Sequence, residues 1–132
     1  MFDLNSVAEL ETAKLKLVHP ESGELIGAEI ELAGASHPKR KALEFQRARI
    51  LRARVSKKGR LELSDPVEDE EFEIDRLVAC TLGWSGLARD GKPIECNAGE
   101  ARAIYESAAW IRKQAGAFLE DSTHFLHSTR KP

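Results

Sequence analysis

An alternation of apolar and charged residues with a period of two runs from Thr12 to Leu32 and is interrupted by a turn-forming stretch, Pro-Glu-Ser-Gly at 20–23. In a β-strand, a period of two places every second side chain on the same face. The pattern therefore predicts a β-hairpin over residues 12–33. A hairpin by itself is only marginally stable in water, so we expect it to pack on a helix of the same chain or to join the sheet of a partner.

The two faces of this hairpin differ in chemistry. The first strand carries Lys14 and Lys16 on its polar face, and the second carries Glu29 and Glu31. Opposite charges that face each other across an antiparallel pair attract, which favours this pairing. The other face is apolar and is expected to point into the core; its residues are Ala13, Leu15, Leu17, Ala28, Ile30 and Leu32.

Helical spacing of apolar residues predicts a helical body over residues 37–127. Its first helix is expected from Pro38 to about Lys57, with Ser36 as the N-cap and Gly59 as the stop signal. Basic residues occupy half of the other positions of this helix. The apolar residues expected to point inward are Ala42, Phe45, Ala48 and either Ile50 or Leu51.

Three more helices complete the predicted body. Asp65 begins a capping box with a proline at the first helical position, and this helix is expected to run through Leu82. Asn97 begins a second capping box, which starts a shorter helix. A last helix, marked by apolar residues three and four positions apart, is expected from Trp110 to Phe125.

The predicted fold class is α+β, mostly α, with an N-terminal β-hairpin followed by about four helices. Apolar residues make up 42% of the chain and charged residues 32%, which allows a packed core and argues against general disorder. We expect a single domain over residues 1–132, in which residues 128–132 form a frayed tail.

Charge is distributed unevenly, although the formal net charge is only −2. Ten basic residues lie between Lys39 and Arg60, where Glu44 is the only acid, and eight acidic residues lie between Glu62 and Asp75. Adjacent blocks of opposite charge pair within one chain or between copies of it, so a homo-oligomer is an open alternative. The balanced total gives no general attraction to nucleic acid or to a membrane surface.

The location expected from the sequence is a reducing cytoplasm. No stretch approaches the roughly 20 apolar residues of a membrane span. The first residues include acids and no apolar run, unlike a signal peptide. Two cysteines are too few for a disulfide scaffold.

The sequence offers no pattern for a catalytic, metal or cofactor site. Cys80 and Cys96 are 16 positions apart, and with His124 and His127 they lack the paired spacing of zinc ligands. A glycine-rich phosphate loop and a Gly-x-Ser-x-Gly elbow are both absent. Cys96 lies near a helix start, which would lower its pKa, but no histidine is close to it in the sequence. We expect a non-enzyme in which both cysteines are dispensable.

The stretch at 81–106 resembles a catalytic loop but is better explained as a connection between two helices. Trp84 is expected to anchor the end of one helix against the next, and Trp110 is expected to have a similar structural role. An Asp-Gly turn follows Trp84. Asn97 and Asp65 are expected to cap their helices.

Nucleic-acid binding is the alternative function that the basic block supports. Its arginines surround one helix, as in elements that follow a phosphate backbone. Phe45 is its only aromatic residue and is expected to be part of the core, and the neighbouring acidic block would repel phosphates. A small nucleic-acid-binding regulator that uses residues 39–60 is therefore the second-ranked function.

Several stretches, taken in order, resemble a known family. They are LVACTLGWSGL at 77–87, DGKPI at 90–94, EARAIYE at 100–106, AWIRKQAGAFLED at 109–121 and FL at 125–126. Their order and spacing resemble the tail assembly chaperones of long-tailed bacteriophages and prophages. The hairpin-then-helix opening is also similar, so the resemblance covers about Val18 to Leu126. Ala109 departs from it, because proline is more usual at that position.

The resemblance implies an assembly factor in the cytoplasm of a bacterial host. Such chaperones bind the long helical tape-measure protein, keep it soluble and recruit tail-tube subunits around it. They are absent from the mature virion. A structural head or tail component that stays in the virion is a further alternative.

The last predicted helix supplies the expected contact surface for a tape-measure segment, because its apolar stripe is wide for so short a body. The apolar contact residues are Phe118, Leu119, Phe125 and Leu126, of which Leu119 and Leu126 are expected to lie off the core. A charged rim is expected from Arg47, Arg49, Arg52 and Arg54. Binding should then be mostly apolar and only weakly sensitive to salt.

Overall fold

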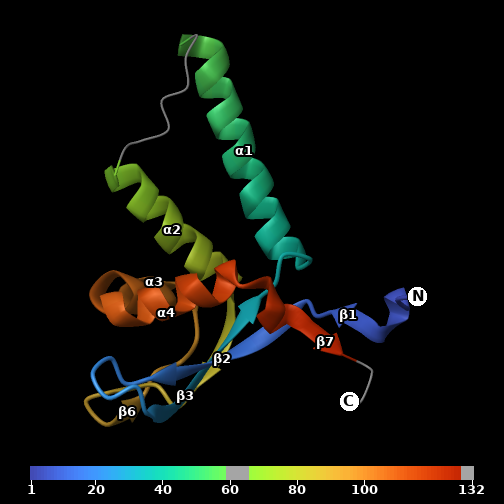
Figure 1. Cartoon of the computed structure of the whole chain (residues 1–132). Coiled ribbons are helices and arrows are strands. Elements are labelled where there is room, and N and C mark those ends of the chain that lie inside the picture. The colour runs from blue at the N-terminus through green and yellow to red at the C-terminus, as the bar shows by residue number, and fades with distance from the viewer. Residues whose placement is uncertain (59–65, 129–132) are drawn as a thin grey trace.

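The computed structural model describes residues 1–58 and 66–128, which form an α+β fold. In Figure 1 the sheets, α3 and α4 form a base from which α1 and α2 project. The helices are α1 (Pro38–Lys58), α2 (Pro66–Cys80), α3 (Ala98–Ser107) and α4 (Ala109–Glu120), and η1 (Leu4–Ser6) and η2 (Ser122–Phe125) are 3₁₀ turns. The strands are β1 (Val7–Glu9), β2 (Thr12–Val18), β3 (Leu25–Ala33), β4 (Thr81–Ser85), β5 (Ala88–Arg89), β6 (Lys92–Pro93) and β7 (Leu126–Ser128).

The predicted hairpin is present as the antiparallel pair β2 and β3. Lys14 lies opposite Glu31 and Lys16 lies opposite Glu29, so the two polar faces have the expected complementary charges. The other face is the apolar one. Its buried residues are Leu17, Ala28, Ile30 and Leu32, with Ala13 and Leu15 partly buried beside them.

A third strand follows α2, where the sequence predicted that the helix would continue through Leu82. The helix ends at Cys80, and the next five residues form β4, which pairs with β3 so that Trp84 lies opposite Ile30. Pairing satisfies hydrogen-bonding groups on the edge of β3 that a helix would leave open. The prediction was wrong here because the partner strand lies far away in the sequence. The sheet order is β2-β3-β4.

The C-terminal segment also departs from the prediction of one helix that extends to Phe125. Helix α4 ends at Glu120, and the Asp121 side chain accepts hydrogen bonds from the backbone N and the Oγ1 of Thr123, at 3.0 and 2.6 Å. This cap starts η2, after which β7 pairs with β1 near the N-terminus. Of the predicted tail, Ser128 is therefore paired in a strand, and residues 129–132 lie outside the described part of the chain.

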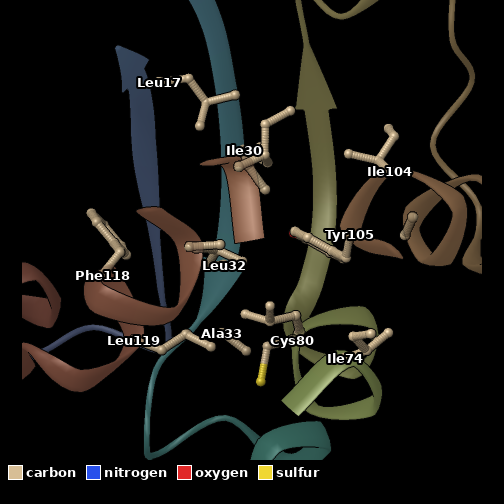
Figure 2. Packing of buried hydrophobic residues seen from close by; sticks show 14 of the residues in the cluster. Leu17, Ile30, Leu32, Ala33, Ile74, Cys80, Ile104, Tyr105, Phe118 and Leu119 are labelled. Atoms are coloured by element: carbon tan, nitrogen blue, oxygen red, sulfur yellow. The ribbon is translucent and has the colours of Figure 1, made fainter. Parts of the chain in front are cut away.

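The core lies between the three-stranded sheet and α2, α3 and α4. In Figure 2, labelled side chains of the sheet and of these helices point toward one another. The helices contribute Ile74, Leu77, Cys80, Ala101, Ile104, Tyr105, Ile111, Ala115, Phe118 and Leu119. Helix α1 contributes no buried apolar residue in its described part. The base of the molecule thus has a complete core without α1.

Helix α1 begins at Pro38 as predicted, but all of the residues predicted to point inward except the half-buried Leu51 are exposed. Phe45 is 64% exposed and Ile50 is 41% exposed. The reason is tertiary, because α1 projects away from the sheet and, among the described elements, packs mainly against α2 (Figure 1). The cap also differs from the prediction of Ser36, since His37 Nδ1 accepts a hydrogen bond from Lys39 N at 3.1 Å.

Arg40 fixes the base of α1 to the core. Its side chain is buried, and its guanidinium donates to the carbonyl oxygens of Ala33 and Leu119 at 3.2 and 3.0 Å. The Nε atom also donates to Glu44 at 3.1 Å. One cation thus joins the start of α1, the end of β3 and the end of α4. A buried charge needs such a full set of partners.

Two buried acidic groups of the core predict a loss of stability at alkaline pH. Burial raises the pKa of the Cys80 thiol from 9.0 to about 11. It also raises the pKa of the Tyr105 hydroxyl from 10.0 to about 12. Both groups are neutral in the folded protein below these values, whereas the unfolded chain ionises at the lower values. Their stabilising contribution is therefore complete below about pH 9 and is lost as pH rises through the folded pKa values.

We expect the urea midpoint of unfolding to fall between about pH 8 and about pH 10.5. Because Cys80→Ala removes one of the two groups, its midpoint should fall less over the same interval, although this variant starts from a lower stability. Circular dichroism at each pH measures both midpoints. Parallel falls for the two proteins would contradict a role for Cys80.

Candidate functional site: a groove between two helices

A groove lies between α1 and α2 and ends at the start of α3. It consists of two hollows of about 550 and 240 Å³, which adjoin each other because they share Leu43 and Gln46 as lining residues. The larger hollow is also lined by Lys39, Ala42, Val78, Ala79, Thr81, Leu82, Cys96, Asn97, Ala98 and Ala101. The smaller one is also lined by Arg47, Ile50, Glu68, Glu71, Phe72 and Asp75.

Helix α2 forms one side of the groove. On α2, Glu71, Asp75 and Val78 follow helical spacing and form one stripe, which lines the groove. Arg76 lies in helical spacing between Phe72 and Ala79, which also line the groove, but Arg76 is not itself a lining residue. It lies within 3.8 Å of Glu44, 3.5 Å of Glu73 and 2.6 Å of Glu120. These ion pairs join α2 to α1 and to the end of α4.

Arg47 holds the two helices together within the smaller hollow. Its guanidinium lies 3.0 Å from Glu68 and 3.6 Å from Asp69, and its central carbon lies 4.7 Å from the centre of the Phe72 ring. The ring contact is a cation–π interaction. Arg47 was predicted to be part of a charged rim for a partner, but its main contacts are with α2.

The other predicted rim arginines differ from Arg47. Arg49 and Arg52 are exposed, and neither makes an ion pair within residues 1–58 and 66–128. Both remain predicted partner contacts. Arg54 belongs to α1, but its side chain lies outside the described part of the chain. Asp65, with the helix cap predicted for it, also lies outside the described residues.

Three of the four predicted apolar contact residues belong to the core. Phe118, Leu119 and Phe125 are 9%, 2% and 5% exposed. The expectation that Leu119 lies off the core is wrong, because the end of α4 packs on the sheet. Phe125 is also folded back by η2, so that its ring meets that of Phe118 edge-on at 5.4 Å. Leu126 is 41% exposed and remains available to a partner.

The two tryptophans that were predicted to be structural anchors both pack against the core. Trp84 is half-buried and donates from Nε1 to the Ile94 carbonyl at 2.8 Å, so it holds the segment before α3 against the sheet. It does so from a strand rather than from a helix end. Trp110 packs against the core from the first turn of α4.

The connection from β4 to α3 follows the predicted pattern in detail. Asp90 and Gly91 have φ angles of 52° and 78°, and they join β5 to β6. Two successive residues with positive φ are typical of a tight hairpin turn of the Asp-Gly kind. Asn97 then caps α3, since its Oδ1 accepts a hydrogen bond from Glu100 N at 2.8 Å.

Cys96 lies in the wall of the larger hollow and is half-buried. Burial raises its pKa, so the lowering expected from the nearby helix start is wrong. Cys80 is fully buried and acts as a small apolar side chain. Within the described residues, no three histidine, cysteine or acidic side chains are grouped in a way that could hold a metal ion. No described helix is long and apolar enough to cross a membrane.

The sequence interpretation missed the groove itself. Leu43 and Ile50 are seven residues apart on α1, and Phe72 and Ala79 are seven residues apart on α2. This spacing is a signal for two facing helix stripes. The inward face predicted for α1 instead included Phe45, which is off this stripe.

Comparisons with known proteins give no family assignment. No protein-family model, no curated protein and no solved structure matches the chain.

Proposed function

We propose that this protein is a tail assembly chaperone, which binds the tape-measure protein and recruits tail-tube subunits during tail morphogenesis. The observation that carries the proposal is the groove between α1 and α2. It consists of two adjoining hollows, whose lining includes apolar side chains such as Leu43, Ile50 and Phe72. An amphipathic helix binds in such a groove by its apolar stripe. A tape-measure protein is a long helical client with many such stripes.

The projecting helices support this function energetically. Ile50 is 41% exposed and Phe45 is 64% exposed, although both lie on a helix with little tertiary support. Apolar side chains on a helix gain stability when another helix covers them. A client helix in the groove would cover Ile50 and Leu43. The proposed binding is therefore mainly apolar, and its affinity should depend weakly on salt.

Recruitment of tail-tube subunits needs a second surface, which we assign to the sheet edge. Within the described residues, no strand pairs with the outer edge of β4. The opposite edge is partly covered, because the Gln114 side chain bonds both the N and the O of Val18 in β2, at 3.0 and 2.9 Å. An open edge can pair with a strand of another protein. In this proposal the protein acts in the host cytoplasm and leaves before the virion is complete.

The proposal predicts that client solubility depends on the groove. We expect a helical tape-measure segment from the same phage or prophage to be soluble when it is co-expressed with this protein and insoluble alone. Ile50→Asp places a carboxylate in the groove and should return most of the client to the pellet. A loss of about tenfold in affinity is expected from one charge at an apolar contact.

A matched control distinguishes the effect of a charge in the groove from the effect of losing any exposed apolar side chain. Leu25→Asp changes a 66% exposed residue of β3, which does not line the groove, and should keep the client soluble. Leu126→Asp tests the remaining predicted contact in the same assay. A client that stays soluble with Ile50→Asp, or without the protein, would reject the proposed function.

A nucleic-acid-binding regulator is the second candidate, and one observation favours it. Phe45 is 64% exposed on α1, where the sequence predicted a core residue, and Lys41, Arg49 and Arg52 are exposed on the same helix. An exposed aromatic ring among cations can stack on bases. A filter-binding titration decides between the candidates, because phosphate contacts give a steep dependence of affinity on salt. Detection of the protein in purified particles would instead favour a structural component.

A further inference from the structure

The charged residues that line the groove are sorted by helix. The bases, Lys39 and Arg47, both come from α1. The acids, Glu68, Glu71 and Asp75, all come from α2. The groove therefore has a basic wall and an acidic wall on either side of an apolar floor.

The two walls retain charge that the described part of the chain does not neutralise. Lys39 and Glu71 are exposed, and neither makes an ion pair within the described residues. Arg49 extends the basic wall, because it is three residues after Gln46 and seven after Ala42, which line the groove. Each wall thus offers charge to an occupant of the groove.

The remaining lining charges have partners inside the protein. Arg47 pairs with Glu68 across the floor at 3.0 Å. Asp75 pairs with Arg102 of α3, which reduces its share of the acidic wall. Glu71 is therefore the main acidic contact that the groove presents, and Lys39 and Arg49 are the main basic contacts.

We infer that the groove selects an amphipathic helix with acidic residues along one flank of its apolar stripe and basic residues along the other, and that it fixes the direction of this helix. The inference rests on the proposed function, since it states which helices of a tape-measure client this site would accept. With the stripe on the floor, the acidic flank must face α1 and the basic flank must face α2. A helix with given flanks satisfies this in only one of its two directions.

Charge adds selectivity to an affinity that is mainly apolar. Exposed ion pairs are individually weak. In the favoured direction three charged residues of the groove face opposite charges of the client, and in the reverse direction they face like charges, so the affinities of the two directions are expected to differ by about tenfold. Like charges placed opposite each other add to the discrimination. A client with both charges mixed on each flank should bind without a preferred direction.

Designed peptides of about 18 residues test the direction. Each has a leucine stripe, glutamates on one flank and lysines on the other, and a single cysteine at either the N-terminal or the C-terminal end. Cys96 lies in the larger hollow at the lower end of the groove, whereas Cys80 is fully buried, so a disulfide to Cys96 reports which end lies there. We expect one of the two peptides to cross-link at least about fivefold more than the other.

The decisive variant exchanges the walls by Lys39→Glu, Arg49→Glu and Glu71→Lys. This variant should cross-link preferentially to the other end of the peptide. Glu71→Lys alone is a smaller change, which the fold tolerates more easily, and it should make cross-linking through the two ends close to equal. A third peptide of the same composition with mixed flanks should cross-link through both ends equally. Melting curves verify that each variant folds.

Equal cross-linking of both ends to the unaltered protein, or the same preferred end after the walls are exchanged, would overturn the inference. Its failure is distinguishable from that of the proposed function. If the peptides bind in one direction but the co-expressed tape-measure segment remains insoluble, the chaperone function is rejected and the selectivity of the groove is retained. A soluble client together with peptides that bind in both directions would do the reverse.

Discussion

Leu119→Asp is expected to abolish folding, whereas Leu126→Asp is expected to leave the fold intact. Leu119 is 2% exposed and packs in the core between α4 and the sheet (Figure 2). Aspartate there would lose the apolar contacts of leucine and would bury a carboxylate. Arg40, which contacts Leu119 through its carbonyl oxygen, already donates to that carbonyl, to Ala33 and to Glu44. Loss of core packing and an unpaired buried charge together cost more than about 5 kcal/mol, which is comparable to the stability of a small domain.

The comparison with Leu126→Asp separates burial from sequence position. Leu126 is 41% exposed in a short strand, so the same change there should alter the free energy of unfolding by about 1 kcal/mol or less. Soluble yield and far-UV circular dichroism measure both outcomes. A Leu119→Asp protein that melts cooperatively near the temperature of the unaltered protein would show that the end of α4 does not pack on the sheet.

Arg40→Ala is expected to lower the free energy of unfolding by about 3 kcal/mol and the melting temperature by about 10 °C. The substitution leaves the carbonyl oxygens of Ala33 and Leu119 without their donor and removes the buried stem of the arginine. Glu44 is partly exposed and remains solvated, so it adds little to the cost. Because Arg40 fixes the base of α1, the variant should also weaken client binding in the groove.

Two further substitutions test the role of the guanidinium itself. Arg40→Lys keeps the charge, but a single ammonium group cannot reproduce the planar set of donors, so most of the loss should remain. Lys41→Ala, at the exposed neighbouring position, should change stability by less than about 0.5 kcal/mol. Thermal melts of the three variants measure these differences. Equal melting temperatures for Arg40→Ala and Lys41→Ala would remove Arg40 from the account of how α1 is attached.

Local features of the sequence determined the elements whose stability depends on near neighbours. The hairpin of β2 and β3 follows from alternation and a turn that lie within one continuous stretch. The starts of α1 at Pro38 and of α3 after Asn97 follow from residues that supply or replace hydrogen bonds within the first turn. The Asp-Gly turn at 90–91 follows from the ease with which these residues adopt positive φ. Each of these structures is specified by contacts a few residues apart.

Only the tertiary structure decided which surfaces are buried and which are open. Residues 81–85 form a strand because the edge of β3, about fifty positions earlier, is available for pairing. Leu119 is buried by the sheet, and Phe45 is exposed because α1 leaves the sheet, although both residues have the same apolar character in the sequence. The groove depends on the angle between α1 and α2, which Arg40, Arg47 and Arg76 set through partners in other elements. Whether a side chain is buried depends on packing partners that are distant in the sequence, and the residue pattern of one helix does not identify these partners.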